Sequence, residues 1–284
     1  MKIGVFEFAI DRSEDPAVLA KRAEELGFAS FWVPEHPIIP LKTTSPYPGS
    51  RDGIIPDEYG RIIDPFVALA RASAVTKAIQ LGTGICLIPE RNPLLLAKEI
   101  ATLDRLSSGR FVFGIGAGWL KEETEIMGGN FEHRWAQTKD AIMAMKELWT
   151  KDESEYHGKF YNFPAVRSFP KPHQKPHPPI YMGGSSQYVF KRIVEWGDGW
   201  MPVLSPVEEI QRGRASLNEM AQKVGRDPKA ISVLAFGRAG KFRTRDEIKA
   251  LEKAGADHVT IWLTQSETKN AVAELEQLAR EVLV

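Results

Sequence analysis

Hydrophobic positions along the chain alternate between short runs rich in β-branched and aromatic residues and longer stretches with helical spacing. The short runs are typical of buried strands, and the longer stretches are typical of helices that pack one face against a core. Helix boundaries are marked as well: Pro16 begins a helix that ends at Gly27, and Asn92-Pro93 begins another that ends at Gly109. The runs predict eight strands, at residues 3–8, 30–35, 79–87, 110–116, 179–183, 199–203, 231–236 and 258–263.

A helix is expected after each of these strands, the last from about Glu267 to the end. The helix after the fourth strand carries a stripe of large apolar residues that we assign to the core, namely Phe131, Trp135, Ile142, Met145 and Trp149. Eight consecutive strand–helix units predict an α/β protein with a (β/α)8 TIM-barrel fold. We expect a single domain over residues 1–284, because such barrels contain about 250 residues.

A glycine-rich stretch, "GIGAGW", tests this prediction against a doubly wound dinucleotide-binding fold. That fold places G-x-G-x-x-G directly after its first strand. Here the first strand–helix turn, "EFAIDRSEDP", contains no glycine, and the glycines at 114, 116 and 118 follow the fourth strand with a different spacing. The stretch is therefore interpreted as the end of a barrel strand.

Composition excludes several classes of partner. Lys plus Arg and Asp plus Glu number 37 each, so the chain has no electrostatic footprint for nucleic acid or an anionic membrane. No run of 18 apolar residues predicts a membrane span. The N-terminus begins with a strand-like run rather than a signal-peptide pattern, and the single cysteine, Cys86, allows no intrachain disulfide. A cytoplasmic protein that binds a small molecule is expected.

Two segments interrupt the regular repeat. Residues 35–64 form a long loop, with six prolines from Pro34 to Pro56, and loops of that length are usually functional or disordered. Residues 151–178 form an extended insertion before the fifth strand and include "FPKPHQKPHPP". Both insertions are expected near the C-terminal mouth of the barrel, where active sites of this fold lie. The first is interpreted as an active-site loop.

Candidate chemistry gathers where strands end. Glu35 and His36 follow the second strand, and a histidine at the mouth can transfer a proton near neutral pH. Local hydrogen bonds that satisfy the imidazole would explain His36 equally well. Thr83 and Gly84, in the third strand, offer a hydroxyl and a permissive backbone, although a bulge at the barrel rim would account for them too.

The fourth and fifth strands end in small residues. Glycines in "GIGAGW" would let a planar ring approach the backbone, or they would serve only packing. Residues 183–186, "GGSS", lie where a strand turns into a helix, so free amides, hydroxyls and the helix dipole can form an anion site. Ordinary serine N-capping is the alternative, and the glycine pair favours the phosphate interpretation.

Two other groups of side chains are set aside. His173 and His177 are four residues apart, but the surrounding prolines exclude a helical zinc pair, and no metal site is expected. Glu122, Glu123 and Glu125 are interpreted as the solvated face of a helix.

Three stretches resemble the luciferase-like monooxygenase superfamily: "GFASFWVPEH", the block from Gly82 to Glu123, and "PIYMGGSSQYVFKRIVEWGDGWMP". Within it, the chain is more similar to the oxidoreductases that use the deazaflavin coenzyme F420. The resemblance covers about residues 1–205, and the block from Gly82 to Glu123 is its most specific part.

The resemblance implies a cofactor at the barrel mouth, with a non-proline cis peptide at Gly84-Ile85 that presses on the central ring. It implies that residues 183–186 hold the cofactor phosphate, that His36 lies near the reaction centre and that the Glu35 carboxylate hydrogen-bonds the cofactor. The cofactor-binding candidates are Thr83, Gly84, Ile85, Gly116, Ala117, Gly118, Trp119, Met182, Gly183, Gly184, Ser185 and Ser186.

The resemblance also frames the function. We expect an F420-dependent oxidoreductase that exchanges hydride with a small organic substrate, with His36 and Glu35 as catalytic residues. The alternatives are an FMN-dependent monooxygenase supplied by a partner reductase, and a barrel that binds a flavin without turnover. Trp119 stands where the sugar-phosphate dehydrogenases of the family have a glutamate, so glucose-6-phosphate is not expected as substrate and a second proton carrier is unassigned. A homodimer formed through helices near the second to fourth strands is expected.

Overall fold

A computed structural model describes residues 1–203, 205–264 and 269–283. Its main sheet is parallel and runs in the order β3-β2-β1-β11-β10-β9-β8-β5-β4, and a further pairing of β3 with β5 closes it into a barrel. β3 and β4 are two parts of one strand interrupted at Gly84-Ile85, so the barrel has the eight strands predicted. The strands are β1 (Lys2–Phe6), β2 (Ser30–Val33), β3 (Gln80–Thr83), β4 (Cys86–Leu87), β5 (Phe111–Gly116), β8 (Ile180–Gly183), β9 (Gly199–Met201), β10 (Ser232–Phe236) and β11 (His258–Trp262).

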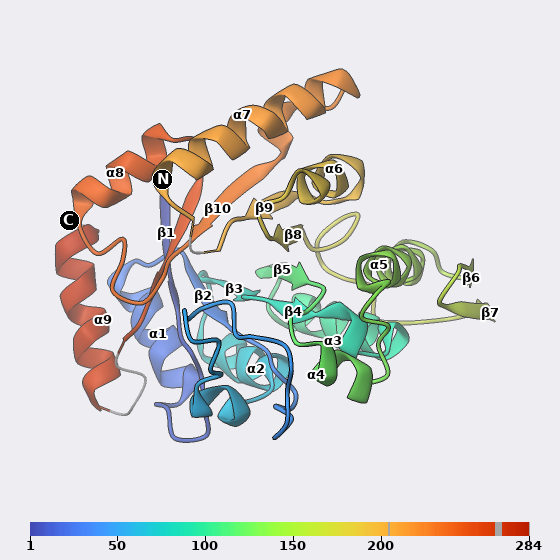
Figure 1. Cartoon of the computed structure of the whole chain (residues 1–284), viewed down its shortest axis with the longest axis horizontal. Coiled ribbons are helices and arrows are strands. Elements are labelled where there is room, and N and C mark those ends of the chain that lie inside the picture. Colours follow the sequence, from blue (N-terminus) through green and yellow to red (C-terminus); the bar gives the residue numbers. More distant parts are fainter. Residues whose placement is uncertain (204, 265–268, 284) are drawn as a thin grey trace.

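Helices surround the strands, and one long helix follows each of them (Figure 1). These are α1 (Pro16–Leu26), α2 (Pro65–Val75), α3 (Pro93–Leu106), α5 (Arg134–Thr150), α6 (Gln187–Trp196), α7 (Val207–Lys223), α8 (Arg245–Lys253) and α9 (Lys269–Val282). Short elements lie in the connections, namely η1 (Asp57–Arg61), η2 (Ile88–Glu90), α4 (Lys121–Ile126) and η3 (Pro228–Ala230).

The predicted helix starts are confirmed at their caps. The side chains of Asp15, Asp64 and Asn92 accept hydrogen bonds from amides in the first turns of α1, α2 and α3, and a proline begins each helix. Gly27 ends α1 with a left-handed φ of 96°. The predicted start of the last helix at Glu267 lies outside the described residues.

The lower part of the barrel is filled by aromatic rings that lie over glycines. A Cβ at Gly82 would lie 2.2 Å from ring atoms of Trp32, and one at Gly199 would lie 2.5 Å from the ring of Tyr181. Both contacts are too close for any other residue. The barrel interior is thus closed below, and open space remains only toward the C-terminal ends of the strands among the described residues.

The insertion at 151–178 begins and ends at the end of the barrel away from the mouth, so its predicted position is wrong; only the tip of its hairpin, which contacts Asp140 in the first half of α5, points toward the mouth. It begins with a hairpin, β6 (Ser154–His157) and β7 (Asn162–Val166), that packs beside α5 at the edge of the molecule (Figure 1). Farther along, Gln174 Nε2 donates to the carbonyl of Phe111, the first residue of β5, at 2.7 Å. The reason is topological: this segment connects a helix to a strand, and such connections lie at the N-terminal ends of the strands, opposite the mouth.

Candidate active site

A cavity of about 510 Å³ opens at the C-terminal ends of β1, β2, β5, β8 and β10. Its size is that of a typical small-molecule site. Many of the predicted site residues line it, which confirms that the selected strand ends converge: Glu35, His36, Gly84, Ile85, Gly116, Ala117, Gly118, Trp119 and Gly183.

The proline-rich loop forms one wall of the cavity, as predicted. It contributes Tyr47, Pro48, Gly49 and Tyr59. The loop is attached to α4 by Glu122, whose carboxylate accepts hydrogen bonds from residues 44 and 45, two of them at 2.8 Å and 2.9 Å from hydroxyl groups. These bonds lower the pKa of Glu122 to about 2, the backbone amide of residue 44 making the largest contribution.

The floor of the cavity is built around a cis peptide bond at Gly84-Ile85, which the resemblance implied. Ile85 explains a neighbouring glycine, because a Cβ at Gly116 would lie 2.1 Å from Ile85 Cδ1. A Cβ at Gly84 would lie 2.8 Å from the ring of Phe236. Glycine at these two positions therefore leaves room for the side chains of Ile85 and Phe236. The backbone of the two glycines also forms part of the surface that a planar ring would contact.

His36 is paired with a carboxylate that the sequence analysis had assigned to solvent. Its Nδ1 lies 2.7 Å from Oε2 of Glu123, which is fully buried on α4. The interpretation of Glu122, Glu123 and Glu125 as a solvated face holds only for Glu125, which is exposed. The sequence spacing could have indicated that Glu123 is buried. Glu123 and Thr124 follow the buried Leu120 by three and four residues, which places both on the inner face of the helix.

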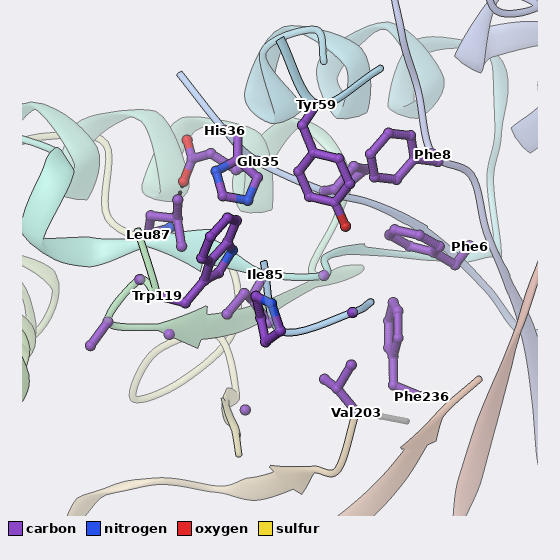
Figure 2. A pocket seen from close by; sticks show the side chains of 18 of the residues that line it. Phe6, Phe8, Glu35, His36, Tyr59, Ile85, Leu87, Trp119, Val203 and Phe236 are labelled. Carbon is purple, nitrogen blue, oxygen red and sulfur yellow. Dashed lines mark hydrogen bonds between the residues drawn. The ribbon is translucent and has the colours of Figure 1, made fainter. Parts of the chain in front are cut away.

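The pairing sets what the imidazole can do. A carboxylate accepts hydrogen bonds only, so Nδ1 carries the proton and Nε2 is left with a lone pair. No described residue bonds to Nε2, and the imidazole ring packs beside Tyr59 at 5.2 Å and Trp119 at 5.8 Å between ring centres (Figure 2). Such an imidazole can take up a proton at Nε2, and the ionised Glu123 stabilises the resulting cation.

Glu35 is held by hydrogen bonds within the chain. Its side chain turns toward the segment after the cis bond (Figure 2), where Oε2 accepts the amide of Leu87 at 2.6 Å. Its other oxygen accepts Nε of Arg91 at 2.5 Å, and Arg91 also binds Asp64 at 2.7 Å. Burial raises the pKa of Glu35, and Arg91 opposes that shift. Both oxygens are bound by the chain itself, so Glu35 braces β4 and η2, and its catalytic role stays a prediction.

A third buried carboxyl lies behind the pair. Glu90 accepts Thr124 Oγ1 at 2.9 Å, and its other oxygen has no partner among the described residues. Burial, followed by the charge of Glu123, raises the pKa of Glu90 to about 8. Glu90 is therefore neutral near pH 7 and adds no second negative charge beside His36.

Five cofactor-binding candidates do not line the cavity, and two of them, Thr83 and Met182, are buried. Thr83 is fully buried, and its hydroxyl donates to the carbonyl of Gly114 at 2.7 Å. Met182 is also fully buried, in the main core between barrel and helices. Strand alternation explains both positions, because a residue next to a lining position points to the other face of the sheet.

Gly184, Ser185 and Ser186 lie beside the cavity, at the N-terminus of α6, and are exposed. Gly184 has a φ of 103°, in the left-handed region that favours glycine. Ser186 occupies the N-cap position, yet its side chain makes no capping bond. Its hydroxyl and the first amides of a ten-residue helix are thus available to an anion, which favours the phosphate interpretation over serine capping.

Two further features of the described residues bear on the class of protein. No group of three His, Cys, Asp or Glu side chains is placed to hold a metal ion. No helix within the described ranges combines the length and the hydropathy that crossing a bilayer requires.

The barrel mouth thus combines a cis peptide floor, an aromatic wall and a helix N-terminus. Residues 12–282 match the family described as luciferase-like monooxygenase, and the chain belongs to this family. It is 35% identical over 286 residues to the uncharacterised protein Rv0953c of Mycobacterium tuberculosis, with 99% of each chain covered.

Relatives in the family use two cofactors. The chain is 27% identical over 271 residues to an F420-dependent glucose-6-phosphate dehydrogenase of Amycolatopsis mediterranei, covering 92% of this chain and 74% of that protein. It is 35% identical over 144 residues to an FMNH2-dependent dimethylsulfone monooxygenase of Pseudomonas putida, covering 47% and 39%. The family thus contains both F420-dependent and FMN-dependent enzymes.

Solved structures show the same fold. Monooxygenase RslO1 from Streptomyces bottropensis has a TM-score of 0.80 at 22% identity, over 100% of this chain and 99% of that one. The coenzyme F420-dependent tetrahydromethanopterin reductase from Methanopyrus kandleri has a TM-score of 0.76 at 18% identity, over 100% and 99%.

Proposed function

We propose that this protein is an F420-dependent oxidoreductase that transfers a hydride between the deazaflavin and a small organic substrate. The observation that carries the proposal is the His36–Glu123 pair, whose free Nε2 borders the cavity. Hydride exchange with an alcohol or a carbonyl also requires a proton carrier at the substrate oxygen. In this account the carrier is His36, oriented by its hydrogen bond to Glu123.

The residues present fit a flat cofactor with an anionic tail. Backbone at Gly116, Ala117 and Gly118 and the side chain of Ile85 would contact the ring, and the free Ser186 hydroxyl at the start of α6 would hold the phosphate. When bound, the deazaflavin supplies the hydride or accepts it. The aromatic wall excludes water from the reacting atoms.

His36 then manages the proton. In the direction of reduction, the imidazolium gives its Nε2 proton to the oxygen of the former carbonyl; in the direction of oxidation, neutral His36 takes the hydroxyl proton. Glu123 keeps the proton on Nδ1 in both directions, so Nε2 is always the atom that reacts. General acid–base catalysis of this kind contributes about 10²–10⁴-fold to rates.

The deazaflavin is favoured by the extent of the similarity. The F420-dependent relative matches 92% of this chain, whereas the FMNH2-dependent relative matches 47%. A purely binding barrel, the third alternative, gives no reason for a buried carboxylate aimed at His36.

An FMN-dependent monooxygenase is the second candidate, supported by the 35% identity within that shorter match. Oxygen uptake separates the two, because reduced FMN reacts with oxygen and a reduced deazaflavin reacts poorly. We expect hydride transfer between the deazaflavin and an alcohol or ketone without oxygen consumption. Oxygen uptake that is stoichiometric with turnover would instead establish the FMN reaction and a need for a partner reductase. If no activity depends on His36, tested with His36→Ala, the binding barrel is correct.

We also propose that the protein is a cytoplasmic homodimer that pairs through α2 and α3. Val67, Leu95 and Leu106 on these helices are 70%, 60% and 75% exposed, an unusual density of apolar surface on two adjacent helices. Light scattering is expected to report a dimer for the wild type and a monomer for Leu95→Glu with Leu106→Glu. A monomeric wild type would contradict the proposal.

A further inference from the structure

The described residues give the wall of the cavity few charged side chains. Among the described residues, neither lysine nor arginine lines it, and the single carboxylate, Glu35, is bound by Arg91. Most of the remaining wall is aromatic, from Phe6, Phe8, Trp119, Trp135, Phe236 and Trp262. A substrate that carried a phosphate or carboxylate into this space would bury an unpaired charge, which is strongly disfavoured.

The loop adds one polar feature to this wall. The hydroxyls of Tyr47 and Tyr59 lie 2.7 Å apart and share a hydrogen bond. Two hydroxyls contain two protons, and only one can lie between the oxygens, so the other remains available to a ligand. Burial raises the pKa of Tyr59, which keeps this hydroxyl protonated.

The available hydroxyl lies beside the proton carrier. The ring of Tyr59 is 5.2 Å from that of His36, and Figure 2 shows its hydroxyl directed into the space between His36 and Phe6. On the other side, Tyr47 packs against Trp119 at 5.6 Å, which is in turn 5.8 Å from His36. The rings of these four residues form a closed cycle of contacts, and all four line the same cavity, so the Tyr59 hydroxyl and His36 belong to one part of its wall.

We propose that the substrate is an uncharged cyclic or aromatic ketone, or the corresponding secondary alcohol, whose oxygen is held by Tyr59 and protonated by His36. This inference rests on the proposed function. In reduction, the carbonyl carbon gains the hydride from the reduced deazaflavin, the π pair moves to oxygen, and that oxygen takes the Nε2 proton. Oxidation of the alcohol is the reverse. Tyr47 is a positioning residue that donates to Tyr59 and so directs the Tyr59 proton toward the substrate.

The substrate class is tested with matched pairs on the reconstituted wild-type enzyme. Cyclohexanone and 4-oxocyclohexanecarboxylate have the same ring and differ by one carboxylate. We expect kcat/KM to favour the neutral ketone by about a hundredfold, the scale of an unpaired buried charge. Equal or faster turnover of the carboxylate would overturn the inference while leaving the proposed function intact. Absence of hydride transfer with every ketone and alcohol would overturn the proposed function itself.

The role of Tyr59 is tested by binding to the protein without cofactor, followed through the fluorescence of the tryptophans that line the cavity. Tyr59→Phe should weaken binding of cyclohexanone about fivefold, the loss of one hydrogen bond, and Tyr47→Phe should weaken it less. Binding of methylenecyclohexane, which has the same shape but no oxygen, should not change in either variant. If Tyr59→Phe weakens both ligands equally, Tyr59 only shapes the cavity and the assignment is wrong. Tyr188→Phe, on the outer surface of α6 and 64% exposed, is the matched control.

Discussion

The two sides of the barrel mouth differ in chemistry. The side formed by the ends of β2 and β5 with α4 brings together His36, Glu123 and Glu90, three titratable groups of which two carboxyls are buried. The part of the mouth next to β5, where β8 turns into α6, offers Gly184, Ser185 and Ser186, which hold no titratable group. Proton transfer and cofactor anchoring are therefore assigned to different strands, and changes on the two sides should have separable effects.

The largest effect is expected from Glu123→Gln. An amide can donate to Nδ1 of His36, which moves the imidazole proton to Nε2 and removes the charge that stabilises the cation. We expect kcat to fall about a hundredfold or more with unchanged affinity for the deazaflavin. Stopped-flow hydride-transfer rates and an equilibrium titration measure the two quantities.

Glu125→Gln is the control for this prediction, because Glu125 lies on the same helix and is exposed. A Glu123→Gln enzyme with the wild-type rate would remove the His36–Glu123 pair from the mechanism.

The next effect is on stability and belongs to the His36 side alone. Burial raises the pKa of Glu90 from its ordinary value of 4.5 to about 8 in the folded protein. Between these two pH values the folded state holds a proton that the unfolded state has released, so stability falls as pH rises through this window. Gln cannot ionise, so the Glu90→Gln variant should not lose stability in this window. We therefore expect its free energy of unfolding, relative to that of the wild type, to rise by on the order of a few kcal/mol as the pH increases from about 5 to about 8.

Urea unfolding at several pH values measures this difference. Glu125→Gln should follow the wild type across the range. A constant offset between Glu90→Gln and wild type at all pH values would show that Glu90 is ionised in the folded protein.

A smaller effect is expected on the α6 side. Ser185→Ala combined with Ser186→Ala removes two hydroxyls from the phosphate position, and we expect about tenfold weaker deazaflavin binding. At saturating cofactor, kcat should be unchanged, in contrast to Glu123→Gln. Fluorescence titration and steady-state kinetics give the two values.

Thr244→Ala provides the comparison, because Thr244 is also an N-cap residue but already bonds within its own capping box on α8. It should lower stability without changing cofactor affinity. Unchanged binding in the double serine variant would place the phosphate elsewhere.

Much of the fold could be predicted because its determinants are local. The strands are uninterrupted apolar runs, and caps such as Asp64 and Asn92 act on amides two or three residues away. The position of His36 and of the glycine-rich ends followed from the rule that strand ends converge in this fold. The cis peptide bond at Gly84-Ile85 was predicted from the family resemblance, because the hydrophobic pattern of residues 79–87 indicates one continuous strand.

The errors concern contacts between distant segments. Glu35 is bound by Arg91, 56 residues later, and His36 by Glu123, 87 residues later. The spacing from Leu120 marks Glu123 as buried, but nothing near either glutamate in sequence indicates which residue it binds. Thr83 was misplaced because an interrupted strand does not reveal which of its faces is inward.

The most direct test of the central claim is a pair of equilibrium titrations of the purified protein, one with coenzyme F420 and one with FMN. The account predicts saturable binding of the deazaflavin at one per chain and much weaker binding of FMN. Saturation by FMN with no measurable binding of the deazaflavin would contradict it.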